Sequence, residues 1–277
     1  MSKSLKVCLF PQTLEWGDKV RNITVLEKTL EHVHPATDLL ILPETFSTGC
    51  PYGEKEEVRQ LCERNTGETV EALKRLASRH NLAIAGSFLA DTGGLLANRA
   101  FFIEPSGEEY FADKRHLFTM AGEDRILSAG DRRLAVRFRG WEIAMVICYD
   151  IRFPVWCRNV GNEYDLLIAV ANWPVARIEA WKKLLAARAI ENEAYVCGVD
   201  CKGTDIKGFE YDGTSMAIDY KGADITVPDP DGGDLLYATL DKERLESFRQ
   251  KFPAYRDADG FILTDDKKVS VFKPNRQ

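Results

Sequence analysis

Three residues of this chain have types and settings that suit hydrolytic chemistry, and the first is Cys148. It follows an apolar run, residues 143–147, with the composition of a buried strand. Because Pro154 cannot continue a sheet ladder, the chain must turn by that point and can begin a helix. A thiol at such an elbow projects from the sheet edge, and the backbone N–H groups after it can bind an oxyanion and favour a thiolate. For this stretch alone, a small buried cysteine with a packing role is an equal alternative.

The other two residues are Glu44, at the end of a short buried run (38–42), and Lys114, which opens an irregular segment (114–131). A carboxylate within hydrogen-bond reach can take the proton of a thiol. Attack on an amide carbon creates an oxyanion, which a lysine ammonium and the backbone N–H of Tyr149 can stabilise. Taken singly, Glu44 and Lys114 are also compatible with solvated surface charges.

Hydrophobic periodicity predicts an alternating order of strands and helices around these residues. Thr66 is expected to be the N-cap of the second helix, and Gly49, Pro51 and Gly53 indicate a loop before it. Two hairpins are expected, 95–103 with 109–112 and 215–218 with 235–239. The other expected strands are 5–10, 38–42, 81–88, 134–138, 143–147, 165–170 and 195–199, and the expected helices are 18–33, 66–79, 152–160, 176–194 and 241–251.

The order of elements repeats within the chain. A DLLI strand at 38–41 and another at 165–168 are each followed by a helix, a strand and an expected hairpin. Two similar βαβ halves can place their sheets face to face with the helices outside, which predicts a four-layer α-β-β-α sandwich in the α/β class. The strands that end after Leu42, Ile147 and Val170 are then expected to open on one rim, where ligands bind. We expect a single domain over residues 1–277, with 252–277 as a C-terminal tail.

Composition excludes several classes of protein. The net charge is −6, with acidic and basic residues mixed throughout, which argues against a nucleic-acid-binding face. No apolar run approaches the ~20 residues that cross a bilayer, and the first apolar run, interrupted at Pro11, is too short for a signal peptide. The seven cysteines are scattered and the four histidines do not cluster with them, so neither a disulfide framework nor a zinc site is expected. The expected location is the reducing cytoplasm.

Three segments, LLILPETF at 39–46, YFADKRHLF at 110–118 and VICYDIRFP at 146–154, resemble the nitrilase (carbon–nitrogen hydrolase) superfamily in their order and separations. The resemblance extends from Lys6 to about Leu263. Further segments, ANWP at 171–174, ARAIEN at 187–192 and KFPAY at 251–255, are similar to the bacterial omega-amidase branch, whose members hydrolyse the side amide of 2-oxoglutaramate and 2-oxosuccinamate. The resemblance implies the α-β-β-α sandwich and an amidohydrolase that needs no metal or organic cofactor.

The resemblance also implies a role for each matching residue. Glu44 is the general base, Lys114 the oxyanion stabiliser and Cys148 the nucleophile. The family's second glutamate, which holds the lysine and positions substrate, is best matched by Glu123, although Asp124 is its neighbour. A homodimer or larger assembly is implied, built partly from the helix after the nucleophile and the C-terminal tail.

Substrate-binding residues are inferred from position. Asp150 and Arg152 flank the nucleophile and are expected to pair as a brace for the elbow. Arg177, near the start of a helix on the expected rim, is then the cation left to bind a substrate carboxylate, with a solvated arginine as the alternative. Trp173 and Phe118 are candidate pocket walls or core aromatics.

Two other functions stay open at this stage. One is another amide hydrolase of the same superfamily, acting on N-carbamoyl amino acids or aliphatic amides. The other is a catalytically silent binding or scaffold protein on the same fold, against which the intact set of Glu44, Lys114 and Cys148 argues.

Overall fold

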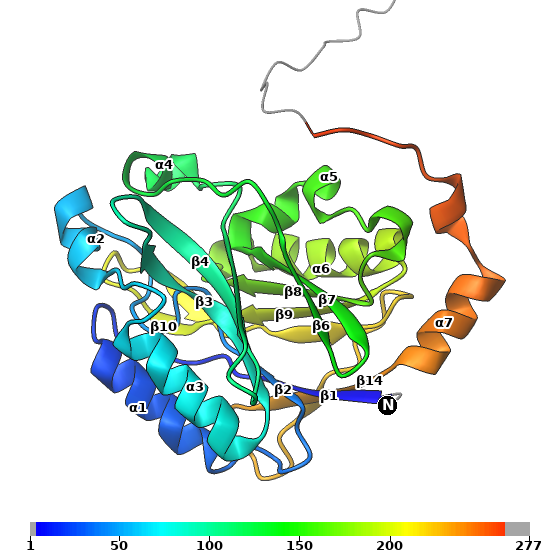
Figure 1. The fold of residues 1–277 in the computed structure, drawn as a ribbon, viewed down its shortest axis with the longest axis horizontal. Helices are drawn as coiled ribbons and strands as arrows, with labels where there is room; N and C mark the ends of the chain where they lie inside the picture. The colour runs from blue at the N-terminus through cyan, green and yellow to red at the C-terminus, as the bar shows by residue number, and fades with distance from the viewer. Residues whose placement is uncertain (1–3, 264–277) are drawn as a thin grey trace, which may run out of the picture.

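Two β-sheets packed face to face form the centre of the molecule in the computed structural model, which describes residues 4–263 (Figure 1). The seven-stranded sheet has the order β13-β14-β1-β2-β3-β4-β5, and the five-stranded sheet has the order β12-β9-β8-β7-β6. The strands of the first are β1 (Ser4–Leu9), β2 (Leu39–Ile41), β3 (Ala83–Asp91), β4 (Leu96–Ile103), β5 (Glu109–Asp113), β13 (Val227–Pro228) and β14 (Leu236–Asp241); those of the second are β6 (Leu134–Phe138), β7 (Trp141–Ile147), β8 (Leu166–Ala171), β9 (Tyr195–Asp200) and β12 (Met216–Ile218). Two short strands, β10 (Lys202–Thr204) and β11 (Glu210–Asp212), pair separately.

The central strands are apolar on both faces because both faces of each sheet are covered. In β1, Val7 and Leu9 lie in the core between the sheets, whereas Cys8 lies in the core beneath the helices on the other side. In β8, Ile168 faces the central core and Leu167 faces the outer one. Three layers of core therefore separate four layers of structure, which confirms the predicted α-β-β-α sandwich.

Helices cover the outer face of each sheet (Figure 1). Helices α1 (Lys19–Leu30) and α3 (Glu68–His80) cover the seven-stranded sheet, and α6 (Ile178–Asn192) covers the five-stranded sheet. Among residues 4–263, no helix has the length and apolar character needed to cross a membrane. The remaining helices are α2 (Lys55–Leu61), α4 (Glu123–Ile126), α5 (Pro154–Cys157) and α7 (Lys242–Lys251), with 3₁₀ turns η1 (Thr119–Ala121), η2 (Cys148–Arg152), η3 (Val160–Asn162), η4 (Val175–Arg177) and η5 (Ala254–Asp257).

Of two local predictions before α3, one is confirmed and one is wrong. The loop that contains Gly49, Pro51 and Gly53 is present, and α2, for which no helix was expected, follows it. Helix α3 begins after Gly67, so Thr66 is not its N-cap. The carboxylate of Glu63 instead accepts a hydrogen bond from the backbone N–H of Thr69 at 3.0 Å, which satisfies a donor of the first turn from outside the helix.

The first predicted hairpin forms, as β4 and β5, but the second is wrong. Strand β12 pairs antiparallel with β9 in the five-stranded sheet, while β14 pairs antiparallel with β1 in the seven-stranded sheet. Strand β14 places Ala238 and Leu240 in the central core, so its apolar face is buried by joining β1. The two halves of the chain therefore repeat as far as β4 and β12, which pair antiparallel with β3 and β9, and differ after them.

The carboxyl ends of the parallel strands meet at one rim, as predicted. Strand β2 lies parallel to β1 and β3, and β7 lies parallel to β8, with Ile147 opposite Val170. Just beyond the strand ends, the backbone N–H of Asn172 donates to Glu44 Oε2 at 2.9 Å. This hydrogen bond joins the two sheets at the place where the candidate residues lie.

Candidate active site

A buried lysine lies between two buried carboxylates at this rim. The Nζ of Lys114 is 2.9 Å from Glu44 Oε1, and 3.0 and 2.9 Å from the two carboxylate oxygens of Glu123. All three side chains are buried. Lys114 follows directly after β5, and its backbone N–H donates to the carbonyl of Asn98 on β4. The hydrogen bonds of the sheet therefore fix the position of the Lys114 backbone.

Glu44 is held from both sheets. Besides Lys114, its carboxylate accepts from Asn98 Nδ2 at 2.7 Å and from the Asn172 backbone at 2.9 Å. The next residue, Thr45, has a left-handed backbone with φ of 45°, and its N–H donates to Ser87 at 2.8 Å. The sequence analysis did not identify Asn98. Its amide lies inside the mostly apolar strand LANRAFFI, and a polar side chain buried there needs a hydrogen-bond partner.

The structure places Glu123, rather than its neighbour Asp124, against the lysine. Glu123 begins α4 and also accepts the backbone N–H of Phe118 at 2.6 Å, whereas Asp124 is exposed. One carboxylate thus fixes both the Lys114 side chain and the loop that follows it.

Cys148 lies at the predicted elbow, directly after β7. Its φ is 44°, a left-handed conformation that costs free energy in a residue with a side chain. The side chain is partly exposed and packs against both the central core and the outer core of the five-stranded sheet. Tyr149 follows in the first turn of η2, where backbone N–H groups have no partner inside the helix.

The surroundings of Cys148 disfavour a negative charge on its sulfur. Burial raises its pKa well above the ordinary value of 9.0, the charge of Glu44 raises it further, and Lys114 lowers it by less. Desolvation and a neighbouring carboxylate thus act against the thiolate that the elbow was expected to favour. Burial lowers the pKa of Lys114, but Glu123 and Glu44 outweigh it and hold that pKa well above 10.5.

The brace predicted between Asp150 and Arg152 is also wrong. Asp150 instead accepts the backbone N–H of Ile147 at 3.1 Å and both the backbone N–H and the ring Nδ1 of His116 at 2.8 Å. The His116 ring stacks on Phe153 at 3.7 Å, which fixes it beside the carboxylate. This arrangement clamps the lysine loop to the nucleophile elbow, and sequence reasoning did not single out His116.

Aromatic and cationic residues border the elbow. Phe118 is partly exposed and packs on Tyr149 at 5.1 Å, and the exposed Arg177 guanidinium lies 5.5 Å above the Phe118 ring. Trp173, in contrast, is a core aromatic that packs on Trp181. The exposed guanidinium of Arg152, which does not contact Asp150, lies 4.7 Å over Trp173.

The indole N–H of Trp173 donates to the carbonyl of Arg177 at 2.8 Å, which anchors the turn that carries this arginine. Arg152 and Arg177 are thus two cations placed near one aromatic border. Of the two candidate pocket walls, the partly exposed Phe118 fits that role and Trp173 belongs to the core.

We expect the neutral thiol to be detectable directly. Ultraviolet absorbance of the thiolate, taken as the difference between wild type and Cys148→Ser, should be absent at neutral pH and should grow only above the ordinary thiol pKa of 9.0. Glu44→Gln removes a charge that raises this pKa, so its thiolate step should move to lower pH. A complete thiolate step at or below neutral pH in wild type would contradict the assignment.

Comparison with known proteins agrees with the fold and shows the family of the chain. The carbon–nitrogen hydrolase family model matches residues 11–250. The chain is 40% identical over 260 residues to the omega-amidase YafV of Yersinia enterocolitica, covering 94% of this chain and 99% of that protein. It is 30% identical over 249 residues to the 2-oxoglutaramate amidase of Bacillus subtilis strain 168, covering 88% and 93%. The solved structure of XC1258 from Xanthomonas campestris, a CN-hydrolase superfamily protein with an arsenic adduct in its active site, superposes with a TM-score of 0.88 at 36% identity, covering 95% of this chain and all of that one.

Proposed function

The chain belongs to the carbon–nitrogen hydrolase family and is a hydrolase of carbon–nitrogen bonds, and from this premise we propose that it is an omega-amidase. The proposed reaction releases ammonia from the side amide of small dicarboxylate monoamides such as 2-oxoglutaramate. Glu44, Lys114 and Cys148 form the proposed catalytic triad. The observation that carries the proposal is the buried Lys114 ammonium within 2.9 Å of the Glu44 carboxylate, at the rim where Cys148 directly follows β7.

In the proposed acylation step, Glu44 takes the proton of the neutral Cys148 thiol as the sulfur attacks the amide carbon. The oxyanion that forms is stabilised by Lys114 and by the backbone N–H of Tyr149. Glu123 does not react; it holds the lysine in place through the two contacts described above.

The tetrahedral intermediate then breaks its carbon–nitrogen bond. Glu44 gives its proton to the leaving nitrogen, ammonia departs, and a thioester on Cys148 remains. Glu44 next takes a proton from water, whose oxygen attacks the thioester carbon. The carbon–sulfur bond breaks, Glu44 returns the proton to the sulfur, the dicarboxylate leaves, and the thiol is restored.

The proposed nucleophile gives the most direct test. Cys148→Ala and Cys148→Ser should abolish ammonia release while the protein stays folded, since loss of a nucleophile typically costs several powers of ten in kcat. Ammonia release from a panel of amides measures this, with circular dichroism and thermal unfolding as controls of folding. Substantial turnover by pure Cys148→Ala would remove Cys148 from the mechanism.

The same panel separates the alternatives. Preference for N-carbamoyl amino acids or for uncharged aliphatic amides would replace the omega-amidase assignment with one of those activities. A silent binding protein would release ammonia from none of them. The buried charge cluster argues against a catalytically inactive protein. Burying a lysine and two carboxylates lowers stability, and a binding scaffold does not need such a cluster.

Arg177 is the proposed partner of the substrate carboxylate. An arginine fork binds a carboxylate through charge-assisted hydrogen bonds worth roughly 1.5–3 kcal/mol each. We expect Arg177→Ala to raise KM for 2-oxoglutaramate about tenfold or more and to leave hydrolysis of hexanamide almost unchanged, since about 1.4 kcal/mol is one power of ten.

The structure supplies a matched comparison, because Arg152 is also an exposed guanidinium over an aromatic ring. Arg152→Ala should be measured with the same two substrates. A selective loss on the acidic amide in Arg152→Ala alone would assign the carboxylate to Arg152. Equal losses on both amides in Arg177→Ala would make Arg177 structural.

A homodimer is the proposed assembly, with a contact that includes residues 152–159 and the tail near 252–255. Phe252 is 60% exposed and Val155 is 49% exposed, so both present apolar surface. The backbone N–H of Ala254 donates to Glu193 at 3.0 Å, which holds the start of η5 against the body. The rest of the predicted tail, from 264 onward, lies outside the described residues.

Sedimentation should show a dimer at micromolar concentration, and Phe252→Glu should shift it toward monomer, because a charge would be buried in the contact. Lys251→Glu, next to it on the chain but polar already, is the control. A clean wild-type monomer at that concentration would refute the proposed assembly.

The proposed location is the cytoplasm. All seven cysteines, which lie within the described residues, are free thiols. A reducing compartment keeps thiols in that state, and the proposed nucleophile requires it.

A further inference from the structure

The two carboxylate oxygens of Glu44, the proposed base, have unequal surroundings. Oε1 accepts from Asn98 Nδ2 at 2.7 Å and from Lys114 Nζ at 2.9 Å. Oε2 accepts from the backbone N–H of Asn172 at 2.9 Å. Because each oxygen of an ionised carboxylate has two lone pairs, Asn98 and Lys114 occupy both lone pairs of Oε1, whereas Oε2 keeps one that can take a proton.

The side chain of Asn98 is explained by its bond to Glu44 and not by packing. It is fully buried in the mostly apolar strand β4. Its oxygen, Oδ1, is also buried and accepts no hydrogen bond from any residue in the described part of the chain. A buried amide oxygen without a donor lowers stability, and an apolar side chain of the same size would avoid that loss. The bond from Nδ2 to Glu44 is the contact that an apolar side chain would not make.

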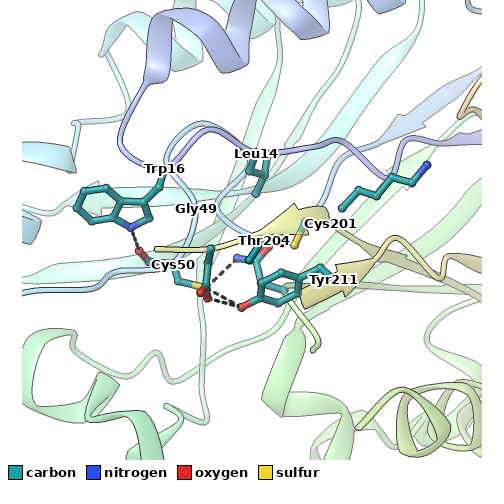
Figure 2. Close-up of a pocket in the computed structure, with 10 residues that line it drawn as sticks. Leu14, Trp16, Gly49, Cys50, Cys201, Thr204 and Tyr211 are labelled. Carbon is teal, nitrogen blue, oxygen red and sulfur yellow. Dashed lines mark hydrogen bonds between the residues drawn. The ribbon is translucent and has the colours of Figure 1, made fainter. Parts of the chain in front are cut away.

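Asn172 reaches Glu44 in a different way, through its main chain. Its side-chain nitrogen is bound elsewhere, donating to Thr45 Oγ1 at 3.0 Å and to Cys50 Sγ at 3.4 Å. Figure 2 shows Cys50 next to Tyr211, whose hydroxyl lies 4.0 Å from the sulfur. Of the two uncharged donors to Glu44, Asn98 and Asn172, only the one from Asn98 can therefore be removed by changing a side chain.

The thiol that gives up its proton lies within reach of the same carboxylate. A hydrogen bond with Glu44 and the charge of Glu44 are both among the causes that raise the pKa of the Cys148 thiol. Since the lone pairs of Oε1 are occupied, the position open to the thiol proton is on Oε2.

We propose that Asn98 is a positioning residue which, together with Lys114, occupies Oε1 of Glu44 and so assigns Oε2 as the oxygen that takes the thiol proton. This inference rests on the proposed function. The S–H bond of Cys148 breaks, the proton bonds to Oε2, and the sulfur electron pair forms the bond to the amide carbon. Oε2 then gives the proton to the leaving nitrogen. While Lys114 stabilises the oxyanion, Asn98 keeps its bond to Oε1 and prevents rotation of the carboxyl group.

Other titratable groups surround the Glu44 carboxylate in the described part of the chain. They are Lys114, Glu123, Cys148, Cys50, Cys201 and Asp200. Burial raises the pKa of the three thiols and of Asp200. Among all these groups, the Asn98 side chain donates to Glu44. A change that follows from substitution of Asn98 therefore reports on that carboxylate.

Asn98→Leu removes the donor and keeps a side chain of similar size. A hydrogen bond to a charged carboxylate favours the charged form, so without it the base takes a proton at higher pH. We expect the acidic limb of kcat/KM for 2-oxoglutaramate to move to higher pH by about one unit. We also expect kcat to fall about tenfold with KM nearly unchanged, because Asn98 holds the base and not the substrate.

Two further variants separate hydrogen bonding from packing. Asn98→Asp keeps the shape but places a second carboxyl group against Glu44. Because two adjacent carboxylates cannot both ionise, its acidic limb should move further than that of Asn98→Leu, whereas a packing role would leave it close to wild type. Ser87→Ala is the control: Ser87 is buried on β3 and accepts from the Thr45 backbone at 2.8 Å, so its loss should lower stability without moving the limb. Asn98→Ala replaces Asn98→Leu if that variant folds poorly. An unmoved acidic limb in the folded Asn98 variants would overturn the proposal.

Neutron diffraction tests the assigned oxygen without turnover. In wild-type crystals held at a pH below the acidic limb, we expect deuterium on Glu44 Oε2; deuterium on Oε1 would overturn the assignment. Wild-type protein that releases no ammonia from any amide would overturn the proposed function, and the neutron map would still decide which oxygen takes the proton. Active wild-type protein whose acidic limb is insensitive to Asn98 would overturn the role of Asn98 alone.

Discussion

The ion pairs of Lys114 with Glu44 and Glu123 are the interaction on which the rim of this fold depends. Three charges buried together are tolerated only if each is paired and hydrogen-bonded, and removing one partner of a buried pair typically costs about 3–5 kcal/mol. Lys114 is paired with both carboxylates. The side chain of Asn98 and the backbone N–H of Asn172 donate further hydrogen bonds to Glu44. Since Asn98 belongs to one sheet and Asn172 follows a strand of the other, satisfying these charges also fixes how the sheets meet.

The backbone around Cys148 is held in place by a different set of hydrogen bonds. Cys148 has a left-handed backbone, which persists only where the surroundings enforce it. Asp150 does so by accepting from Ile147, just before the cysteine, and from His116, two residues beyond the lysine. The clamp therefore sets the separation between the sulfur and the ammonium, and the strained elbow and the charged cluster are parts of one structure.

The difference between what the sequence predicted and what it did not follows from the range of the interactions. The buried strands, the elbow at Cys148 and the sandwich follow from local periodicity and order, and the three motifs indicated Glu44, Lys114 and Cys148. The contact of Asn172 with Glu44 spans 128 residues and that of His116 with Asp150 spans 34, so neither is encoded in local pattern. The Asp150–Arg152 brace was wrong for the same reason: it assumed the nearest opposite charge in sequence, whereas the histidine arrives from another loop. Likewise, β14 does not form the predicted hairpin, because it pairs with β1 in the other sheet and buries Ala238 and Leu240 in the central core.

The charge count explains why the site has a lysine between two acids. Lys114 forms ion pairs with Glu44 and Glu123, while burial and the charge of Glu44 raise the pKa of the Cys148 thiol. In the proposed attack, the thiol proton neutralises Glu44 while a negative charge appears on the substrate oxygen. The net charge of the buried site does not change; the charge moves from one neighbour of Lys114 to another. In this proposed step, Lys114 exchanges a carboxylate partner for an oxyanion partner, and Glu123 keeps it in position during the exchange. Because no charge is created in a desolvated space, the step avoids the cost that a preformed thiolate would carry in the resting enzyme.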